Sequence, residues 1–167
     1  YINSSGDTVW AFVGTFLVRN DENIPLYFVT HIEDITARKN AEERLRESQK
    51  NYQALFNKNR DGYVINKGSG ELIDPNPAFA KMLGYSVEEA KKISFWELTP
   101  EKWVEWEANI HGEKLLERGY TDLYEKEYIH RDGTVFPIEV QAFLLNEAKD
   151  LDSALIGAFV RDITERK

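Results

Sequence analysis

The chain has 167 residues, and its 29 acidic and 21 basic side chains give it a formal net charge of −8. A chain this acidic repels a polyanion, which excludes sequence-independent nucleic-acid binding as the main activity. The lack of cysteine excludes a disulfide scaffold, a cysteine-ligated metal site and a cysteine nucleophile. It also fits a reducing compartment, and no apolar run reaches the length of a transmembrane helix. We therefore expect a cytoplasmic fragment without membrane contact.

The beginning of the chain repeats its end. Residues 34–39 read DITARK and residues 162–167 read DITERK, with a single difference between them. Two β-rich runs precede each motif, and these four runs cover residues 8–18, 24–33, 134–145 and 152–161. A match of this kind indicates an internal repeat. We predict that residues 1–39 form a β-hairpin, the last two strands of a unit whose complete copy ends at residue 167.

The segment between the two copies, residues 40–58, is predicted to form one amphipathic helix. Its small or apolar side chains alternate at spacings of four and three residues, at Ala41, Leu45, Ser48, Tyr52 and Leu55. This is the seam spacing of a coiled coil, in which Ala41, Leu45, Tyr52 and Leu55 would contact a second copy of the chain. Two heptads are equally compatible with a helix that lies on its own domain, so both arrangements stay open.

The first part of the second copy alternates short strands and helices. Strands are predicted at residues 62–68 and 71–76, around a Gly-Ser-Gly turn. Asn76-Pro77 is an N-cap followed by proline, which predicts a helix that Gly84 ends. The pairs Ser86/Glu89 and Ser94/Glu97 have the spacing of capping boxes and predict two further helix starts.

A longer helix and three strands complete the pattern. The helix is predicted from Thr99-Pro100 to about Glu117, with Gly119 as its stop, and carries Trp103, Trp106, Ile110 and Leu115. Strands at residues 120–130 and 134–145 are joined by Asp132-Gly133, a strong hairpin signal, and a third strand follows. Glu125 and Glu127 share one strand face, which favours a half-solvated face over an acid–base pair. The predicted fold class is α+β.

This order of elements resembles the PAS domain family in its form with a trailing PAC motif. The segments that carry the resemblance are NPAF (76–79) with LGYS (83–86), YEKEY (124–128), RDGTVFP (131–137) and DITERK (162–167). The resemblance implies a five-stranded antiparallel sheet with helices on one face. It divides the chain into the C-terminal strands of an incomplete PAS/PAC domain (1–39), a signalling helix (40–58) and a complete PAS domain with its PAC motif (59–167).

The resemblance also implies a role in signal transduction. Such domains are sensory or dimerising modules of bacterial and archaeal sensor proteins, most often histidine kinases, in two-component systems. We expect a homodimer and an output domain further along the same chain. Two functions remain open: sensing of a small ligand, or dimerisation and signal relay without a ligand. The parent is expected to be a sensor histidine kinase, and the alternative is a diguanylate cyclase or phosphodiesterase.

No catalytic site is predicted in this fragment. His130-Arg131-Asp132 is similar to a kinase catalytic loop, but the asparagine and the glycine-rich phosphate loop that such a site needs are missing. No histidines and carboxylates fall at the spacing of metal ligands, so no metal site is predicted.

The repeated motif has a coupling role in the family that the chain resembles. Asp34 and Thr36, and in the second copy Asp162 and Thr164, stand where a strand ends and a helix begins. Their side-chain oxygens can cap the new helix, and Thr36 is the predicted N-cap of residues 40–58. We predict that these four residues couple the domain to the helix, and the alternative is that they are caps alone.

Many members of this family hold a cofactor between helices and sheet. A cysteinyl-flavin adduct is excluded because the chain has no cysteine. His111 is the single haem-ligand candidate, but its spacing to the following strand differs from that of haem-binding members, so no cofactor is predicted. A small organic ligand stays open, and the residues predicted to surround it are Phe79, Met82, Trp96, Trp106, Ile110, Tyr128 and Ile138. The alternative is that these side chains fill the core. An anionic ligand would need a cation, for which Arg118 and Arg161 are the candidates.

Overall fold

The computed structural model describes residues 1–166, which fall into two compact units, one from Tyr1 to Gln53 and one from Ala54 onward. Lys167, the last residue of the predicted closing motif and of the predicted second domain, lies outside the described residues. Within the described part of the chain, no helix is long and apolar enough to cross a membrane.

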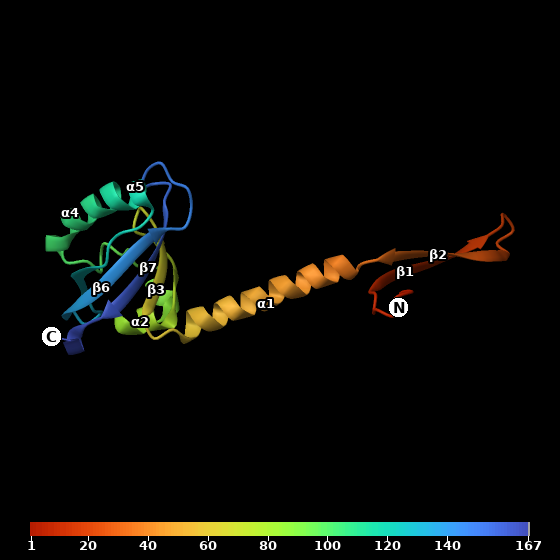
Figure 1. The fold of residues 1–167 in the computed structure, drawn as a ribbon, viewed down its shortest axis with the longest axis horizontal. Helices are drawn as coiled ribbons and strands as arrows, with labels where there is room; N and C mark the ends of the chain where they lie inside the picture. The colour runs from red at the N-terminus through yellow and green to blue at the C-terminus, as the bar shows by residue number, and fades with distance from the viewer. Residues whose placement is uncertain (167) are drawn as a thin grey trace. The chain divides into compact units, whose positions relative to one another are not determined.

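The first unit is a hairpin followed by the start of a helix (Figure 1). Strands β1 (Ala11–Arg19) and β2 (Pro25–Asp34) pair antiparallel, and α1 follows as Thr36–Lys58. Their turn is closed by the Asn20 side chain, which accepts hydrogen bonds from the backbone N–H of Glu22 and Ile24 at 3.1 and 2.8 Å. Phe16 and Phe28 point to opposite faces and are both exposed. Since a two-stranded hairpin buries little apolar surface by itself, this one lacks a core of its own.

The junction between β2 and α1 differs from the sequence prediction in one detail. The Asp34 carboxylate accepts the backbone N–H of Thr36 at 2.9 Å, and the Thr36 hydroxyl accepts the backbone N–H of Trp10 at 2.9 Å. Thr36 is thus the first residue of the helix, and its predicted role as the N-cap is wrong. Its hydroxyl instead fixes β1 to the helix start, because Asp34 already caps the first free N–H.

The second unit contains the predicted five-stranded antiparallel sheet (Figure 1). Its strands are β3 (Gly62–Lys67), β4 (Leu72–Pro75), β5 (Tyr124–Ile129), β6 (Val135–Leu144) and β7 (Leu155–Asp162). They lie in the order β4-β3-β7-β6-β5, so β3 and β7, which come first and last in the sequence of this unit, are neighbours in the sheet. The predicted hairpin between β5 and β6 is confirmed, with Gly133 at φ 86° in its turn. The strand predicted at 120–130 begins four residues later, at Tyr124.

Short helical segments connect β4 to β5. They are α2 (Pro77–Met82), α3 (Val87–Ala90), α4 (Glu101–Ile110), the π-helical turn η1 (His111–Leu115) and α5 (Leu116–Arg118), and the 3₁₀ turn η2 (Thr164–Arg166) follows β7. Asn76 caps α2, and Ser86 and Glu89 form the predicted capping box of α3. The helix predicted at Ser94 is wrong. There the Glu97 carboxylate accepts the backbone N–H of Ser94 at 3.0 Å and closes an irregular turn.

The helices cover one face of the sheet, and the core lies between the two layers. Core side chains from the sheet and from the segments that cover it include Val64, Leu72, Tyr128, Phe136, Ile138, Val140, Ile156, Val160, Phe79, Leu83, Phe95, Leu98 and Leu115. Strand positions of even number in β6 and β7 face this core, as the alternation of buried side chains along both strands requires.

The two copies of the repeat have the same strand register. Asp34 lies opposite Ala11 in the first copy, and Asp162 lies opposite Ile138 in the second. In both copies the residue after the Asp donates its N–H to the partner strand, from Ile35 to Trp10 and from Ile163 to Pro137. The registers place Thr15 and Thr30, whose hydroxyls are 3.3 Å apart, at the positions of Ala142 and Ala158.

Candidate functional site

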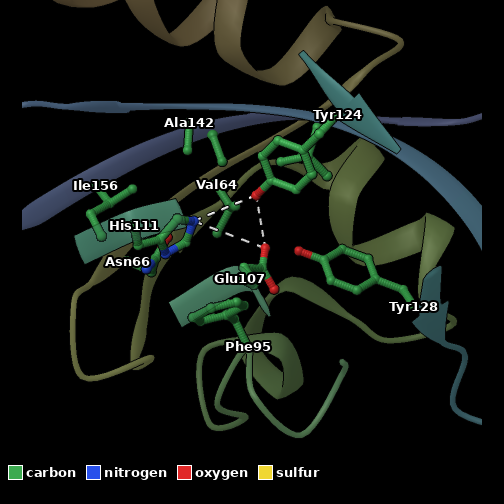
Figure 2. Close-up of a pocket in the computed structure, with 11 residues that line it drawn as sticks. Val64, Asn66, Phe95, Glu107, His111, Tyr124, Tyr128, Ala142 and Ile156 are labelled. Carbon is green, nitrogen blue, oxygen red and sulfur yellow. Dashed lines mark hydrogen bonds and ion pairs between the residues drawn. The ribbon is translucent and has the colours of Figure 1, made fainter. Parts of the chain in front are cut away.

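A small cavity of about 10 Å³ lies between the sheet and the helical segment from α4 to η1 (Figure 2). This is about the volume at which a single water molecule fits. Its lining consists of Val64, Asn66, Phe95, Glu107, His111, Tyr124, Tyr128, Val140, Ala142, Ile156 and Ala158. The wall formed by β3, β6 and β7 is mostly apolar, and the wall formed by α4, η1 and β5 carries ionisable groups.

A buried ion pair adjoins the cavity. The Lys126 ammonium on β5 contacts the Glu107 carboxylate on α4, and neither side chain is more than 2% exposed. Lys126 also donates a hydrogen bond to the Thr99 hydroxyl at 3.0 Å. Its Nζ lies 5.2 Å from the centre of the Phe95 ring and 4.5 Å from that of the Tyr128 ring, within the range of cation–π attraction.

The alternation of β5 explains how a lysine comes to be buried. Successive side chains of a strand point to opposite faces, so Tyr124, Lys126 and Tyr128 share the inner face. Glu127 points the other way, where its carboxylate accepts a hydrogen bond from the Trp103 indole N–H at 3.1 Å. The sequence predicts Glu125 and Glu127 on a half-solvated strand face. Because Lys126 lies between them, the same alternation places its side chain on the inner face, and this could be read from the sequence.

Further donors surround the Glu107 carboxylate. The Tyr124 hydroxyl donates to Glu107 Oε1 at 2.8 Å. His111 Nε2 lies 3.9 Å from the same oxygen and 3.5 Å from the Tyr124 hydroxyl. Figure 2 shows the three side chains converging, with dashed lines that join the imidazole, the phenol and the carboxylate. We call the five residues Thr99, Glu107, His111, Tyr124 and Lys126 the buried polar cluster.

Burial shifts the pKa values of this cluster. It lowers the pKa of Lys126 to about 8, against the opposing attraction of Glu107. It also lowers the pKa of His111, so the neutral imidazole is favoured. Burial, reinforced by the negative charge of Glu107, raises the pKa of Tyr124 and Tyr128 well above 10. Near neutral pH the buried polar cluster therefore contains an ammonium and the protonated phenol of Tyr124, and the neighbouring Tyr128 keeps its proton as well.

The π-helical turn η1 gives this part of the helix its inward face. The apolar positions Ile110 and Leu115 are five residues apart, which is the repeat of a π-turn rather than of an α-helix. The turn buries His111 at one end and Leu115 at the other, next to Glu107 in the last part of α4. Turns of this kind interrupt the regular helix ladder and occur often at functional sites.

Of the residues predicted to surround a ligand, Phe79 and Tyr128 lie together, with ring centres 6.2 Å apart. Tyr128 lines the cavity, whereas Phe79 and Ile138 are core residues beyond its lining. Met82 and Trp96 pack against the core, Ile110 is half-buried, and Trp106 is 40% exposed. Ligand contact by these residues stays a prediction.

The cationic candidates for an anionic ligand are on the surface. Arg118 and Arg161 have side chains that are 51% and 49% exposed. Lys126 does not line the cavity itself but pairs with Glu107, which does. Sequence reasoning did not single out Glu107 and Lys126, because a lone charged residue inside a helix or strand pattern is usually solvated. Tyr124 is part of the YEKEY segment that carries the family resemblance, and His111 is the haem-ligand candidate.

The predicted dimer and coupling residues lie outside the cavity. Ala41, Leu45, Tyr52 and Leu55 are exposed on α1, and Leu45 and Leu55 are 61% and 76% exposed. At the second copy of the motif, the Asp162 carboxylate accepts hydrogen bonds from the Thr164 backbone N–H at 2.8 Å and from its hydroxyl at 2.6 Å. Asp162 thus accepts the backbone N–H of the residue two positions later in the chain, and Asp34 does the same in the first copy.

The two strands that line the centre of the cavity also connect to the flanking helices. Strand β3 follows α1 and contributes Val64 and Asn66, while β7 contributes Ile156 and Ala158 and leads to η2. Asp61, which precedes β3, accepts two hydrogen bonds from Arg161 near the end of β7, at 3.0 and 2.6 Å.

Comparison with known proteins agrees with this architecture. A sequence profile described as a PAS domain matches residues 60–165. The methyl sulfide methyltransferase-associated sensor of Methanosarcina acetivorans is 30% identical over 129 residues, which are 76% of this chain and 12% of that protein. Sporulation kinase E of Bacillus subtilis is 34% identical over 70 residues, which are 42% of this chain and 10% of that protein. The chain therefore spans about a tenth of the length of these curated relatives.

A solved structure supports the same assignment. The crystal structure of the PAS domain of an HTR-like protein from Haloarcula marismortui has a TM-score of 0.55 and 26% identity, and covers 75% of this chain and 99% of that one. The predicted fold class is confirmed by the five-stranded sheet and by this likeness. Since the matched profile covers more than half of the residues, the chain belongs to the PAS domain family.

Proposed function

We propose that residues 59–167 are a sensory and signal-relay module of a multidomain signal-transduction protein, most simply a sensor histidine kinase. The module detects a small ligand, or receives a conformational signal, and transmits it through its flanking helices to an output domain in the same chain. It has no catalytic role itself. The kinase assignment is supported by the likeness to sporulation kinase E, and a cyclase or phosphodiesterase parent is the alternative outcome.

The observation that carries this proposal is the position of the cavity relative to β3 and β7. These neighbouring strands line the cavity, and they are also the strands that continue into α1 and η2. A change in the packing of the cavity therefore acts on the two segments that enter and leave the domain. The hydrogen bonds between Asp61 and Arg161 join those segments directly, so the strand ends move together.

The hairpin of the first unit is proposed to be the end of an upstream PAS domain. Its register matches that of β6 and β7 residue by residue, including the backbone hydrogen bond after the Asp. Its exposed apolar side chains, Phe28 and Ile32 among them, would then be covered by the missing part of that domain. In this arrangement α1 joins two sensory units, and Asp34 and Thr36 have the coupling position that Asp162 and Thr164 have after the second unit.

Dimerisation through α1 completes the proposal. The helix buries none of its side chains, yet it presents the row formed by Ala41, Leu45, Tyr52 and Leu55. Burial of exposed leucines against a second copy supplies a driving force of about 1.5–3 kcal/mol per side chain. A parallel pair of such helices would transmit a rotation or a shift from one unit to the next.

Native and denaturing mass spectrometry of residues 1–167 tests the sensor function first. A mass excess on the native chain that disappears on denaturation supports ligand sensing. A bare dimer supports ligand-free relay. A bare monomer at every concentration contradicts the dimeric relay, because no second helix is then present to carry a signal. It also excludes a ligand that binds tightly enough to survive purification, and a weaker ligand is tested by titration.

A further inference from the structure

The Glu107 carboxylate occupies what would otherwise be an anion site. Lys126 and Tyr124 from β5 contact it directly, and the imidazole of His111 faces it from η1. These groups offer an ammonium, a phenol and a ring nitrogen around one buried carboxylate. Such a set of donors is what a protein uses to bind the carboxylate of a ligand. Here the carboxylate that they bind belongs to the protein itself, to Glu107 of α4.

The ion pair contributes little to stability by itself, so a ligand carboxylate can replace Glu107 at little cost in stability. The desolvation of two buried charges offsets most of their attraction, so the net stability of such a pair is small. A ligand with a carboxylate of its own can take the place of Glu107 beside Lys126. The lysine then keeps a negatively charged partner. Glu107 can then turn away with the end of α4, next to the irregular π-helical turn.

The remainder of the cavity indicates the rest of the ligand. The wall opposite the buried polar cluster is mostly apolar, with Val64, Val140, Ala142, Ile156 and Ala158. The polar side chain on this wall, Asn66, donates a hydrogen bond to the backbone carbonyl of Lys67 at 2.8 Å. At about 10 Å³ the cavity has no room for a ligand until Glu107 moves. Beyond its Cα, the Glu107 side chain has the atoms of propionate, so the space it vacates matches a short aliphatic acid.

We propose that this pocket is a receptor site for a short-chain aliphatic monocarboxylate, which binds Lys126 and Tyr124 in competition with the Glu107 side chain. The inference rests on the proposed sensory function and names the ligand class for it. The carboxylate pairs with the Lys126 ammonium, and the alkyl chain contacts the apolar wall formed by β3, β6 and β7. Occupation of the site releases α4 from β5, and this is the change that the strands transmit.

The test is a titration of residues 1–167 with sodium propionate, followed by the chemical shifts of backbone amides around the cavity. Propionamide and sodium chloride at the same concentration are the ligand controls. We expect saturable shifts for Ala142 and Ala158 with propionate alone, with a dissociation constant on the order of 1 mM. Equal shifts with propionamide, or no saturation up to about 50 mM, overturn the proposal.

Variants separate the proposed site from an unspecific effect. Glu107→Gln removes the competing charge and should tighten propionate binding about tenfold. Lys126→Met should abolish binding, and Tyr124→Phe, which keeps the ring, should weaken it and serves if the lysine variant does not fold. Glu105→Gln changes an exposed carboxylate of the same helix and should leave binding unchanged. Binding by the Glu107→Gln variant but not by the wild type overturns the proposal, since Glu107 is then a permanent occupant.

The outcome is distinct from the test of the proposed function. A different ligand found by native mass spectrometry, with no response to propionate, leaves the sensory function standing and overturns the monocarboxylate. Saturable propionate binding by a chain that stays monomeric supports the pocket and contradicts the dimeric relay.

Discussion

Asp61 and Arg161 are one hundred positions apart in the chain and share two hydrogen bonds, with the Arg161 Nε 3.0 Å and Nη2 2.6 Å from the Asp61 carboxylate. Asp61 stands at the entry to β3 and Arg161 near the end of β7. Arg161 also lies 4.0 Å from Glu139 of β6, and Arg166 of η2 contacts the same glutamate at 3.1 Å. The entry and the exit of the domain are thus linked by one chain of charged groups.

The pKa of Asp61 should report this link. Arg161 lowers it below the ordinary value of 3.8 by hydrogen bonding. A carboxyl with a lowered pKa stabilises the fold above that ordinary value and loses the contribution as the pH falls. We expect the Asp61 titration, followed by NMR, to move up towards 3.8 in Arg161→Gln. Arg131→Gln, which removes a contact with Glu89 instead, is the control, and an unchanged Asp61 titration in Arg161→Gln would show that the link is absent in solution.

The buried ion pair should give a strong non-additive effect on stability. Glu107→Leu leaves Lys126 unpaired in the core, and Lys126→Met leaves Glu107 unpaired, so each should cost about 3–5 kcal/mol in the free energy of unfolding. The double variant has no orphaned charge and should cost less than the sum, with a coupling of at least about 1 kcal/mol. Urea unfolding of the four proteins measures this cycle. Additive losses would mean that the two side chains do not interact in solution.

Lys126 should also shape the alkaline stability of the domain. Its pKa is about 8 in the folded chain against 10.5 ordinarily, so above pH 8 the unfolded state holds a proton that the folded state has released. The unfolded state binds more protons there, and the stability therefore rises with pH. Above about pH 10 the raised pKa values of Tyr124 and Tyr128 act in the opposite direction.

We therefore expect the free energy of unfolding of the wild type, relative to that of Lys126→Met, to increase between about pH 8 and pH 10. Urea unfolding at intervals across this range is the measurement. Parallel curves for the two proteins would mean that the lysine has an ordinary pKa in the folded chain.

Asn76 should be the most sensitive cap of the domain. Its buried amide accepts the backbone N–H of Phe79 at 2.8 Å and of Tyr63 at 2.9 Å, and donates to the carbonyls of Phe56 and Asp61, both at 3.1 Å. Asn76→Ala leaves several buried groups without partners, so we expect a loss of about 3 kcal/mol.

The matched control for that variant is Ser86→Ala, which removes the exposed cap of α3 and should cost about 1 kcal/mol. Unfolding midpoints in urea measure both losses. Equal losses would contradict the role of Asn76 as the residue that joins the end of α1, β3 and α2.

Self-association should depend on the exposed seam of α1. Leu45→Asp with Leu55→Asp introduces two charges where the proposed dimer buries leucines, and we expect the dissociation constant to rise more than a hundredfold. Gln53→Asp with Asn57→Asp adds the same charge at exposed positions off the seam and is the control. Sedimentation equilibrium measures both. A dimer that persists in the leucine variant places the contact elsewhere.

The sequence was a good guide where a local rule determines the backbone. Asn76 before Pro77, the Ser86 capping box and the Asp132-Gly133 turn each act over a few residues, and the structure has all three. Ser94 shows the limit of such a rule. Its partner Glu97 is present and hydrogen-bonded, but the segment also pairs with Glu71, and this contact holds it in a turn.

The candidate site could not be predicted in the same way, because its residues meet across two layers. Glu107 and Lys126 come from a helix and a strand, and periodicity gives the face of each element but not the partner on the other. The five-residue step from Ile110 to Leu115 was visible in the sequence, yet a π-helical turn is too rare to be expected from one spacing.

The adjacency of β3 and β7 limits the kind of movement that can leave this domain. Side chains alternate between the two faces, so a slide of β7 by one residue would turn Ile156, Ala158 and Val160 out of the core. The strand must therefore keep its register while it moves. The displacement that reaches η2 is then a tilt or a shift much shorter than the spacing of about 3.3 Å between strand residues, and a helix has to amplify it before a distant domain can respond.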